Sequence, residues 1–241
     1  MSDDRKLTTQ ELVKIAAEAE KAVAEAETAR ALSRLHIANA REAEAQAEKY
    51  EIELTAAREK ELSRQHSDYH KRLYQFSGAV ERASVNACMS QLREWDRLDP
   101  SCDIEVIFNS PGGSVIDGMA LFDLLVRLSL RGGGTHKVTI GAQGYAASMA
   151  GILLQAADVR WIGAQSYLMI HEISAGASGK IGEITDAVKF YDAICARVVN
   201  IFVNRSEGKI TKAKFIAGWL RTDWWLMSDA ALKLGFVDEV R

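Results

Sequence analysis

The chain has 241 residues, of which 48% are hydrophobic, and its formal net charge is −3 at pH 7. This composition can bury a sizeable core, which excludes disorder throughout, and the charge gives no electrostatic reason to expect a nucleic-acid partner. No uninterrupted apolar run reaches the roughly 18 residues of a membrane span, and the charged start MSDDRKLTTQ is unlike a signal peptide. We therefore expect a cytoplasmic protein without a membrane segment.

The first 70 residues differ in composition from the rest and predict one long helix. They contain 15 alanines, 15 acidic residues and 11 lysines or arginines, and the first glycine of the chain is Gly78. Alanine, glutamate, lysine and arginine lose little rotamer freedom in a helix. Thr8 with Glu11 three residues later fits a capping box. We expect a helix from about Thr9 to Gln65, roughly 85 Å long at 1.5 Å per residue.

The pattern within this N-terminal arm, residues 1–70, leaves its packing open. Alanine fills most of a three-four seam from Leu12 to Ala57, Ser33 and His36 interrupt the seam, and a leucine-zipper pattern is absent. One hypothesis is a coiled coil or partner-binding arm, and the other is a charged, solvated helix that frays or bends. An isolated polar helix of this length has little reason to persist unless neighbours cover its apolar stripe, which favours the first hypothesis.

The remaining residues, 71–241, predict a second domain in which strands alternate with helices. Strands are expected at 72–78, 103–108, 137–142, 159–162 and 167–171. Helices are expected at 84–99, 115–130, 148–157, 182–206, 211–220 and 228–234. This alternation predicts an α/β fold with a parallel sheet covered by helices.

The turn NSPGGS, residues 109–114, follows an apolar strand and precedes a helix. Its two glycines let backbone N–H groups face outward with no side chain in the way, which can hold a phosphate or an oxyanion. An ordinary turn is the simpler interpretation of this motif taken alone. It is not a P-loop, because no Gly-Lys-Ser/Thr follows.

Ser148 stands between small residues in GYAASMAG and opens an apolar helical run. A serine at a helix N-terminus lies where backbone N–H groups are unpaired, and such groups stabilise the oxyanion of an acyl-transfer intermediate. Serine is also a favoured N-cap, and taken alone that interpretation is the simpler one.

His171 ends the apolar run YLMI and is followed by the glycine-rich stretch SAGASGKIG, a combination that no other histidine of the chain has. A histidine at a strand end is also often a core residue. A hydrolytic serine needs a base, and the base needs an orienting acid. The acids after His171 include Glu172, Asp186, Asp192, Asp223, Asp229 and Asp238, and spacing alone does not choose among them.

The cysteines give no sign of a metal site. Cys88, Cys102 and Cys195 are widely spaced and form neither a CxxC pair nor a zinc-binding spacing. We expect buried or free thiols and no bound metal.

Four motifs in order, NSPGGSVIDGM, GYAASMAG, LMIHE and DAALKLGFVDEV, resemble the ClpP family, the proteolytic subunits of Clp proteases. The resemblance covers about residues 72–241, and RLYQFSGAVE also resembles the family's first strand and turn. It implies a ClpP/crotonase-like fold of repeated ββα units, here preceded by a long helix. It also implies serine endopeptidase activity without a cofactor, any use of ATP belonging to a separate partner ATPase.

Carried over to this sequence, the resemblance implies Ser148 as nucleophile, His171 as general base and Asp223, in RTDWWLMSDAALKLGFVDEV, as the acid. It implies that the backbone N–H groups of Gly113 and Met149 form the oxyanion hole. It further implies a homo-oligomer, a heptameric ring or a stacked double ring with the helix at about 183–203 between rings, and a Clp-type AAA+ ATPase as partner.

Three departures from the family pattern qualify these expectations. The family usually has Gln-Pro after the histidine, where this chain has Glu172 and Ile173. The loop RGGGTHK lengthens the interval between SPGG and the serine. The long helix replaces the short axial loops that engage the ATPase, which puts that partnership in doubt.

Other functions remain open to the sequence. The unusual arm also suggests a phage-type enzyme, including a capsid-maturation (prohead) protease whose helix binds scaffold or capsid protein. From other classes come a crotonase-type acyl-CoA enzyme, against which the set Ser148, His171 and Asp223 argues, and a non-catalytic scaffold. Protein or peptide substrates are expected for the protease hypotheses.

Overall fold

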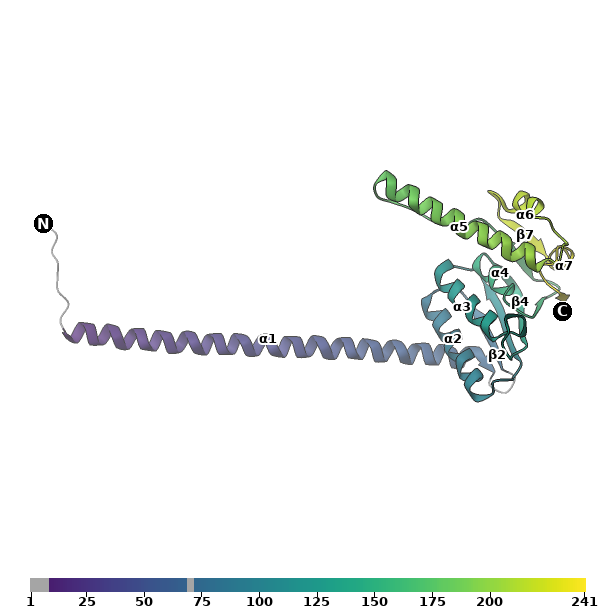
Figure 1. Ribbon diagram of the computed structural model, residues 1–241. Helices are drawn as coiled ribbons and strands as arrows, with labels where there is room; N and C mark the ends of the chain where they lie inside the picture. Colours follow the sequence, from purple (N-terminus) through teal and green to yellow (C-terminus); the bar gives the residue numbers. More distant parts are fainter. Residues whose placement is uncertain (1–8, 69–71) are drawn as a thin grey trace. The chain divides into compact units, whose positions relative to one another are not determined.

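The computed structural model describes residues 9–68 and 72–241 (Figure 1). The described residues fall into two compact units that meet along the chain between Ala57 and Arg58. We call residues 58–241 the catalytic unit. The predicted domain boundary at 70/71 touches residues outside the described ranges, as does Thr8 of the predicted capping box, so both stay predictions.

The first unit belongs to one helix, α1, which runs from Thr9 to His66 and confirms the predicted helix (Figure 1). Every side chain of α1 that the structure describes is exposed. Large apolar side chains do not gather on one face of α1, because Leu32 and Tyr50 share a face at 3.6 residues per turn while Ile52 lies almost opposite. Local contacts such as the Lys21–Glu25 pair, at 3.9 Å, support the helix weakly.

The catalytic unit is built on a mostly parallel sheet, which confirms the predicted class. Its strands are β1 (Ser67–Asp68), β2 (Leu73–Ser77), β3 (Ile104–Ser110), β4 (Val138–Ala147), β5 (Val159–Ile162), β6 (Tyr167–Ile170), β7 (Trp224–Met227) and β8 (Glu239–Val240). The order is β1-β2-β3-β4-β5-β8, with β6 beside β4 and β7 beside β6. Only β1–β2 and β6–β7 pair antiparallel among the described strands.

The long strand β4 divides between two neighbours. Its first half, Thr139–Ala142, pairs with β5, and its second half, Tyr145–Ala147, pairs with β6. Because both neighbours lie parallel to the same strand, β6 continues the sheet beyond the end of β5. This fork carries the end of β4 to the site described below.

The helices cover the sheet through apolar stripes. They are α2 (Arg82–Leu98), α3 (Val115–Leu128), α4 (Met149–Leu154), α5 (Ile181–Arg205), α6 (Lys212–Trp219) and α7 (Ser228–Lys233), with a 3₁₀ turn at Leu130–Gly132. In α2 the buried residues Val85, Cys88, Leu92 and Trp95 recur at the three-four spacing of one helix face. Burying each such side chain contributes about 1.5–3 kcal/mol before the entropy cost of ordering it.

The predicted end of the strand expected at 137–142 was wrong. β4 continues five residues past Ala142, through Gly144. Gly141 is needed within the strand, because a Cβ there would lie 2.0 Å from the ring of Trp161 on β5. The strands β1, β7 and β8 were not predicted from the sequence. β1 and β8 are only two residues long, and β7 pairs with β6, a strand more than 50 residues earlier in the chain.

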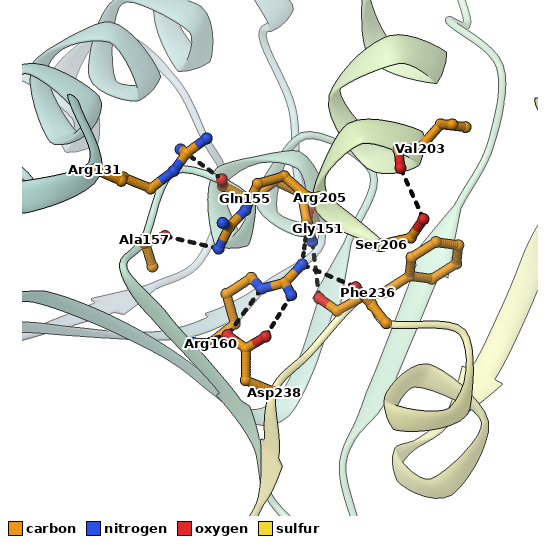
Figure 2. Close-up of polar contacts among 11 residues, drawn as sticks. Arg131, Gly151, Gln155, Ala157, Arg160, Val203, Arg205, Ser206, Phe236 and Asp238 are labelled. Carbon is orange, nitrogen blue, oxygen red and sulfur yellow. Dashed lines mark hydrogen bonds and ion pairs between the residues drawn. The ribbon is translucent and has the colours of Figure 1, made fainter. Parts of the chain in front are cut away.

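A buried polar cluster fastens the end of the chain to the sheet (Figure 2). Arg160 on β5 is 1% exposed and donates from Nε to Asp238 at 3.0 Å and from Nη1 to Gln155 at 2.7 Å. Burial opposes ionisation of Asp238, but the hydrogen bonds and charge of Arg160 outweigh it and hold the pKa of that carboxyl below its usual value. Burial, helped by the charges of Arg160 and Arg131, lowers the pKa of Arg205 to about 10. Gln155, at the end of α4, also donates to the Phe236 carbonyl at 3.1 Å, so the segment after α7 is tied to β5 and to the end of α4.

In the part of the chain that the structure describes, no helix is both long enough and apolar enough to cross a membrane.

Candidate active site

Three neighbouring strand ends bring Ser148, His171 and Asp223 together. Ser148 follows the last residue of β4, and its N–H donates to Met169 of β6 at 2.8 Å. His171 follows β6, and Asp223 precedes β7. Because β6 and β7 are antiparallel with Ile170 opposite Trp224, the next residues outward are His171 and Asp223. Strand pairing therefore places three residues far apart in sequence at one edge of the sheet.

The serine and the histidine are in direct contact. His171 Nε2 lies 2.7 Å from Ser148 Oγ, a normal hydrogen-bond distance. With its proton on Nδ1, the ring accepts the serine O–H at Nε2 and directs its own N–H toward Asp223. This is the arrangement in which a histidine can remove the serine proton.

The contact to the acid is looser. His171 Nδ1 lies 3.6 Å from Asp223 Oδ1, which is within ion-pair reach but longer than a hydrogen bond. The side chain of Asp223 is 66% exposed, whereas that of His171 is 24% exposed. Solvent therefore competes with the histidine for this carboxylate.

Ser148 has a strained backbone, with φ 54° and ψ −122°. A non-glycine residue in this region costs of order 1–3 kcal/mol and persists where the surroundings hold it. Ser148 occupies the N-cap position of α4, but its side chain makes no capping hydrogen bond. The simpler interpretation of the sequence, a serine that caps its helix, is therefore wrong, because the hydroxyl faces His171 instead. A sharp strand-to-helix turn of this kind presents a nucleophilic oxygen.

The turn at Pro111–Gly113 passes directly over the serine. A Cβ on Gly112 would lie 2.7 Å from Ser148 Cβ and 2.8 Å from the backbone nitrogen of Met149, so a side chain has no room there. A Cβ on Gly113 would lie 2.3 Å from the carbonyl oxygen of Val80. The Val80 N–H donates to the Gly112 carbonyl at 2.9 Å and pins the turn.

The N–H groups of Gly113 and Met149 are available to a ligand. Neither takes part in any of the hydrogen bonds found among the described residues. Both residues line the same cavity as Ser148 and His171. Two N–H donors beside a serine are the arrangement that stabilises the oxyanion of a tetrahedral intermediate.

This cavity has a volume of about 320 Å³ and an apolar wall. Val115, Ile152, Val198 and Trp219 contribute side chains from four different helices. Among the described residues, Glu172 is the only acidic one that lines it. Sequence reasoning missed Val198 and Trp219, because no local signal on α5 or α6 shows that they meet α4 at this site.

Comparisons with known proteins agree with this arrangement. The family model described as Clp protease matches residues 58–241. The chain belongs to the Clp protease family. It is 30% identical over 165 residues to the ATP-dependent Clp protease proteolytic subunit of Bacteroides thetaiotaomicron, covering 67% of this chain and 70% of that protein. For the corresponding protein of Bacteroides fragilis the identity is 29% over 165 residues, covering 67% and 74%. For the ATP-dependent Clp protease proteolytic subunit 2 of Tropheryma whipplei the identity is 30% over 173 residues, covering 71% and 91%.

Membership in the Clp protease family makes this chain a protease and confirms the resemblance and the fold class predicted from its motifs. It favours the protease hypotheses over the crotonase-type enzyme and the non-catalytic scaffold.

The other candidate acids of this Clp protease are engaged elsewhere or lie away from His171. Asp238 is paired with Arg160, and Asp186 lies 3.2 Å from Lys189 on an exposed part of α5. Among the described acidic residues, only Asp223 is within ion-pair distance of His171. Glu172 instead accepts a hydrogen bond from the backbone N–H of Arg221 at 2.7 Å, a contact that the sequence did not suggest.

A second group with similar residue types has a structural role. His136 is buried, with Nε2 3.0 Å from Asp96 and Nδ1 2.8 Å from the carbonyl oxygen of Cys102. Burial, together with the charge of Asp99, raises the pKa of the Cys102 thiol, so this thiol is not activated. Since His136 donates to a backbone carbonyl, it ties the loop before β3 to the loop before β4.

The longer loop RGGGTHK does not disturb the Clp protease site. It precedes Val138, the first residue of β4, whereas Ser148 follows the last residue of that strand. The carboxylate of Asp158 closes the loop by accepting the N–H groups of Arg131 and Val138, each at 2.8 Å. This departure from the family pattern therefore lies at the opposite end of the strand from the serine.

No set of three or more histidine, cysteine, aspartate or glutamate side chains suited to a metal ion occurs in the described ranges.

Proposed function

We propose that this protein is a serine endopeptidase in which Ser148 is the nucleophile, His171 the general base and Asp223 the orienting acid. The observation that carries the proposal is the 2.7 Å contact between His171 Nε2 and Ser148 Oγ, inside a cavity that also holds the N–H groups of Gly113 and Met149. Family membership supports the reaction class, and the geometry supports the roles of the individual residues.

In the acylation step, Ser148 Oγ attacks the carbonyl carbon of the scissile peptide bond while His171 Nε2 takes its proton. The carbonyl oxygen becomes an oxyanion and accepts hydrogen bonds from the N–H groups of Gly113 and Met149. The C–N bond then breaks as His171 returns the proton to the leaving amine. An ester between Ser148 and the acyl part of the substrate remains.

In the deacylation step, water replaces the amine. His171 takes a proton from the water as its oxygen attacks the ester carbon, and the same N–H groups stabilise the second oxyanion. Collapse of this intermediate returns the proton to Ser148 Oγ and releases the carboxylic acid. Asp223 favours the imidazolium that forms in both steps, and its exposure makes this contribution smaller than that of a buried acid.

We propose further that the protein works as a ring-shaped homo-oligomer, heptameric or a stacked double ring, supplied with protein substrates by a Clp-type ATPase. The relatives are named as proteolytic subunits of ATP-dependent proteases, which supports an assembly with a separate ATPase. The first turns of α5 extend away from the other helices of the catalytic unit and expose Ile181, Val188 and Phe190 (Figure 1). A second copy that covers these side chains would remove apolar surface from water.

Labelling with a fluorophosphonate tests the chemistry. We expect the purified full-length protein to be labelled at Ser148, and Ser148→Ala and His171→Ala to remain unlabelled with unchanged thermal unfolding midpoints. Labelling of folded Ser148→Ala at the same rate would overturn the assignment. Electron micrographs and sedimentation of the same samples test the ring, which is contradicted by a monomer that hydrolyses peptides at full rate.

A further inference from the structure

The loop that carries the acid has few supports of its own. Residues 220–223, which we call the acid loop, join α6 to β7, and all four are exposed. Asp223 is therefore presented to His171 from solvent-exposed backbone, immediately before the pairing of β7 with β6 begins at Trp224. Something must hold this loop if the carboxylate is to stay near the histidine.

We propose that Glu172 is a positioning residue that holds the acid loop so that Asp223 faces His171. The proposal rests on the proposed function, because it takes Asp223 as the acid of the site. Glu172 Oε2 accepts a hydrogen bond from the Arg221 N–H at 2.7 Å, although the two residues are 49 positions apart in the chain. Arg221 lies two residues before Asp223, and Glu172 directly follows His171.

The conformation of Arg221 shows why the loop needs this contact. Arg221 has φ 56°, the left-handed region that non-glycine residues rarely adopt. Such a conformation persists only when surrounding contacts determine it. A carboxylate that accepts a backbone N–H is a strong, charge-assisted partner of the kind that can do so. Among the described residues, the other turn or cap backbone bonds of the acid loop both lead back to α6, from Leu220 N–H to the Ile216 carbonyl at 3.0 Å and from Thr222 N–H to the Trp219 carbonyl at 3.2 Å.

Glu172 is itself well placed to act as an anchor. It is half-buried in the wall of the cavity, two residues beyond the end of β6 and next to the base. The contacts therefore close a ring from His171 through Glu172 and Arg221 to Asp223 and back to His171. The contact between His171 Nδ1 and Asp223 Oδ1, at 3.6 Å, is the loosest in this series. The distance between these two atoms therefore depends on the hydrogen bond between Glu172 and the Arg221 N–H. Losing that bond lets the exposed acid loop move and takes the carboxylate away from Nδ1.

The identity of the side chain also fits. Only an acceptor of this length is needed at position 172, so a glutamine, whose Oε1 accepts the same N–H, should replace the glutamate with little loss. Alanine at this position removes the acceptor and leaves the Arg221 N–H to solvent.

A double-mutant cycle on the full-length protein tests the proposal. Glu172→Ala, Glu172→Gln, Asp223→Asn and Glu172→Ala/Asp223→Asn are compared with the unmodified protein for kcat and KM on a short fluorogenic peptide and for thermal unfolding. We expect Glu172→Ala to lower kcat about 10- to 100-fold, as expected for a misplaced group, with KM nearly unchanged. Glu172→Gln should stay within about threefold of the unmodified protein. Asp229→Asn, an exposed carboxylate on α7, is the matched control and should change neither constant.

The decisive comparison is made in the Asp223→Asn background. If Glu172 acts through Asp223, Glu172→Ala should cost less than about twofold once Asp223 has been changed, because the two effects are not additive. An equal loss in both backgrounds would mean that Glu172 acts independently, through substrate charge or general folding, and would overturn the proposal. Full activity of Glu172→Ala would also overturn it.

These outcomes are distinct from failure of the proposed function. Activity retained in Ser148→Ala would contradict the assignment of Ser148 as the nucleophile. Activity retained in Asp223→Asn would contradict the assignment of Asp223 as the acid, and with it the role given to Glu172. A strong effect of Asp223→Asn with no effect of Glu172→Ala would contradict the positioning role alone. If Glu172→Ala fails to fold, a second truncation, Glu172→Ser, takes its place. Comparing it with Glu172→Gln, both alone and combined with Asp223→Asn, shows in the same way whether Glu172 acts through Asp223.

Discussion

The arm and the catalytic unit use opposite sources of stability. In α1 every described side chain is exposed, and the helix rests on propensity and on weak pairs such as Lys49–Glu53 at 3.9 Å. In the catalytic unit the aromatic rings of Phe76 and Phe108 lie 5.0 Å apart within a buried core. Substitutions in the arm should therefore act locally, whereas those in the catalytic unit should act on the whole fold or on the reaction.

The arm and the catalytic unit also differ in whether their packing can hold a catalytic site. Nucleophilic catalysis requires groups held in a defined geometry by packed surroundings. The cavity around Ser148 has such surroundings, with Met149, Ile152 and Trp219 buried beside it. No comparable packing is found along the described part of the arm. The exposed side chains along the described part of α1 fit the hypothesis of a partner-binding arm, which stays a prediction.

The largest expected effect comes from removing the proposed nucleophile, which tests whether the chemistry lies in the catalytic unit. Ser148→Ala should lower peptide hydrolysis on the order of 10⁶-fold, because the nucleophile and its base act as one unit. Thermal unfolding should stay the same, since Ser148 makes no capping hydrogen bond that the substitution would remove. Steady-state hydrolysis of a fluorogenic peptide measures the loss, with Ser33→Ala, an exposed serine of α1 in the first unit, as the control that retains full activity. Hydrolysis by folded Ser148→Ala at the original rate would mean that another residue is the nucleophile.

The second effect measures how much a loose acid contributes. Asp223→Asn would cost about 10⁴-fold in kcat if the acid worked as in a tight triad. With a 3.6 Å contact and an exposed carboxylate, we expect a loss nearer 10²-fold. Asp229→Asn should have no effect and Glu172→Gln only a slight one, as measured by kcat under the same conditions. If either proves more damaging than Asp223→Asn, Asp223 is not the orienting acid.

A matched pair of leucines contrasts the two regions directly. Leu92→Ala, in the buried stripe of α2 where the side chain is 0% exposed, should lower the free energy of unfolding by about 2–5 kcal/mol. Leu35→Ala, on the arm where the side chain is 54% exposed, should change it by less than about 0.5 kcal/mol. Urea denaturation followed by tryptophan fluorescence reports on the catalytic unit in both variants. Equal destabilisation by the two substitutions would show that the arm packs on the core.

Breaking the polar cluster around Arg160 should lower the free energy of unfolding by less than Leu92→Ala can, and by an amount that depends on pH. Asp238→Asn should destabilise the catalytic unit by about 2–3 kcal/mol at pH 7, below the range for a fully buried pair, because the Asp238 side chain is 34% exposed. The pKa of Asp238 is lowered in the folded protein, so its contribution is present above the unfolded pKa and is lost as the pH falls through the folded value.

Denaturation of Asp238→Asn and the unmodified protein at several pH values tests this sign. The gap in stability between them should be constant near neutral pH and should narrow below about pH 4, the usual range of an aspartate. A gap that widens in acid would contradict the assigned direction.

The smallest effect on hydrolysis is expected from removing residues 1–57, the first unit and most of the arm. This deletion leaves the catalytic unit from Arg58 onward and should leave cleavage of a short peptide within about twofold, because no described residue of the deleted segment lines the cavity. Copies of the arm brought together in an oligomer would reach roughly millimolar local concentration, enough for a weak seam to pair. Cleavage of a partner-delivered protein should therefore fall while peptide cleavage persists.

Size-exclusion chromatography with light scattering and the two cleavage assays check this prediction. An insoluble or monomeric truncated chain would mean that the arm belongs to the structural core. Unchanged cleavage of both substrates would show that the arm neither gates nor recognises them.

The sequence alone determined the elements whose identity is local. The long helix, the main strands and helices of residues 72–241, and the contexts of Ser148 and His171 follow from propensity, periodicity and glycine placement within short windows. These signals are local because a helix or a strand–turn–helix depends mostly on neighbours in sequence. The four ordered motifs then indicated the family.

Only the tertiary structure decided the groups that depend on pairing between distant segments. Nine acidic residues follow His171 in the sequence, and only a resemblance singled out Asp223 among them. In the structure the antiparallel pairing of β6 with β7 brings Asp223 to the histidine. The same pairing brought Arg221 to Glu172, and helices α5 and α6 supplied Val198 and Trp219 to the cavity. β7 is four residues long and has no sequence pattern of its own. Its place comes from hydrogen bonds to a strand more than 50 residues earlier, which no local window of the sequence contains.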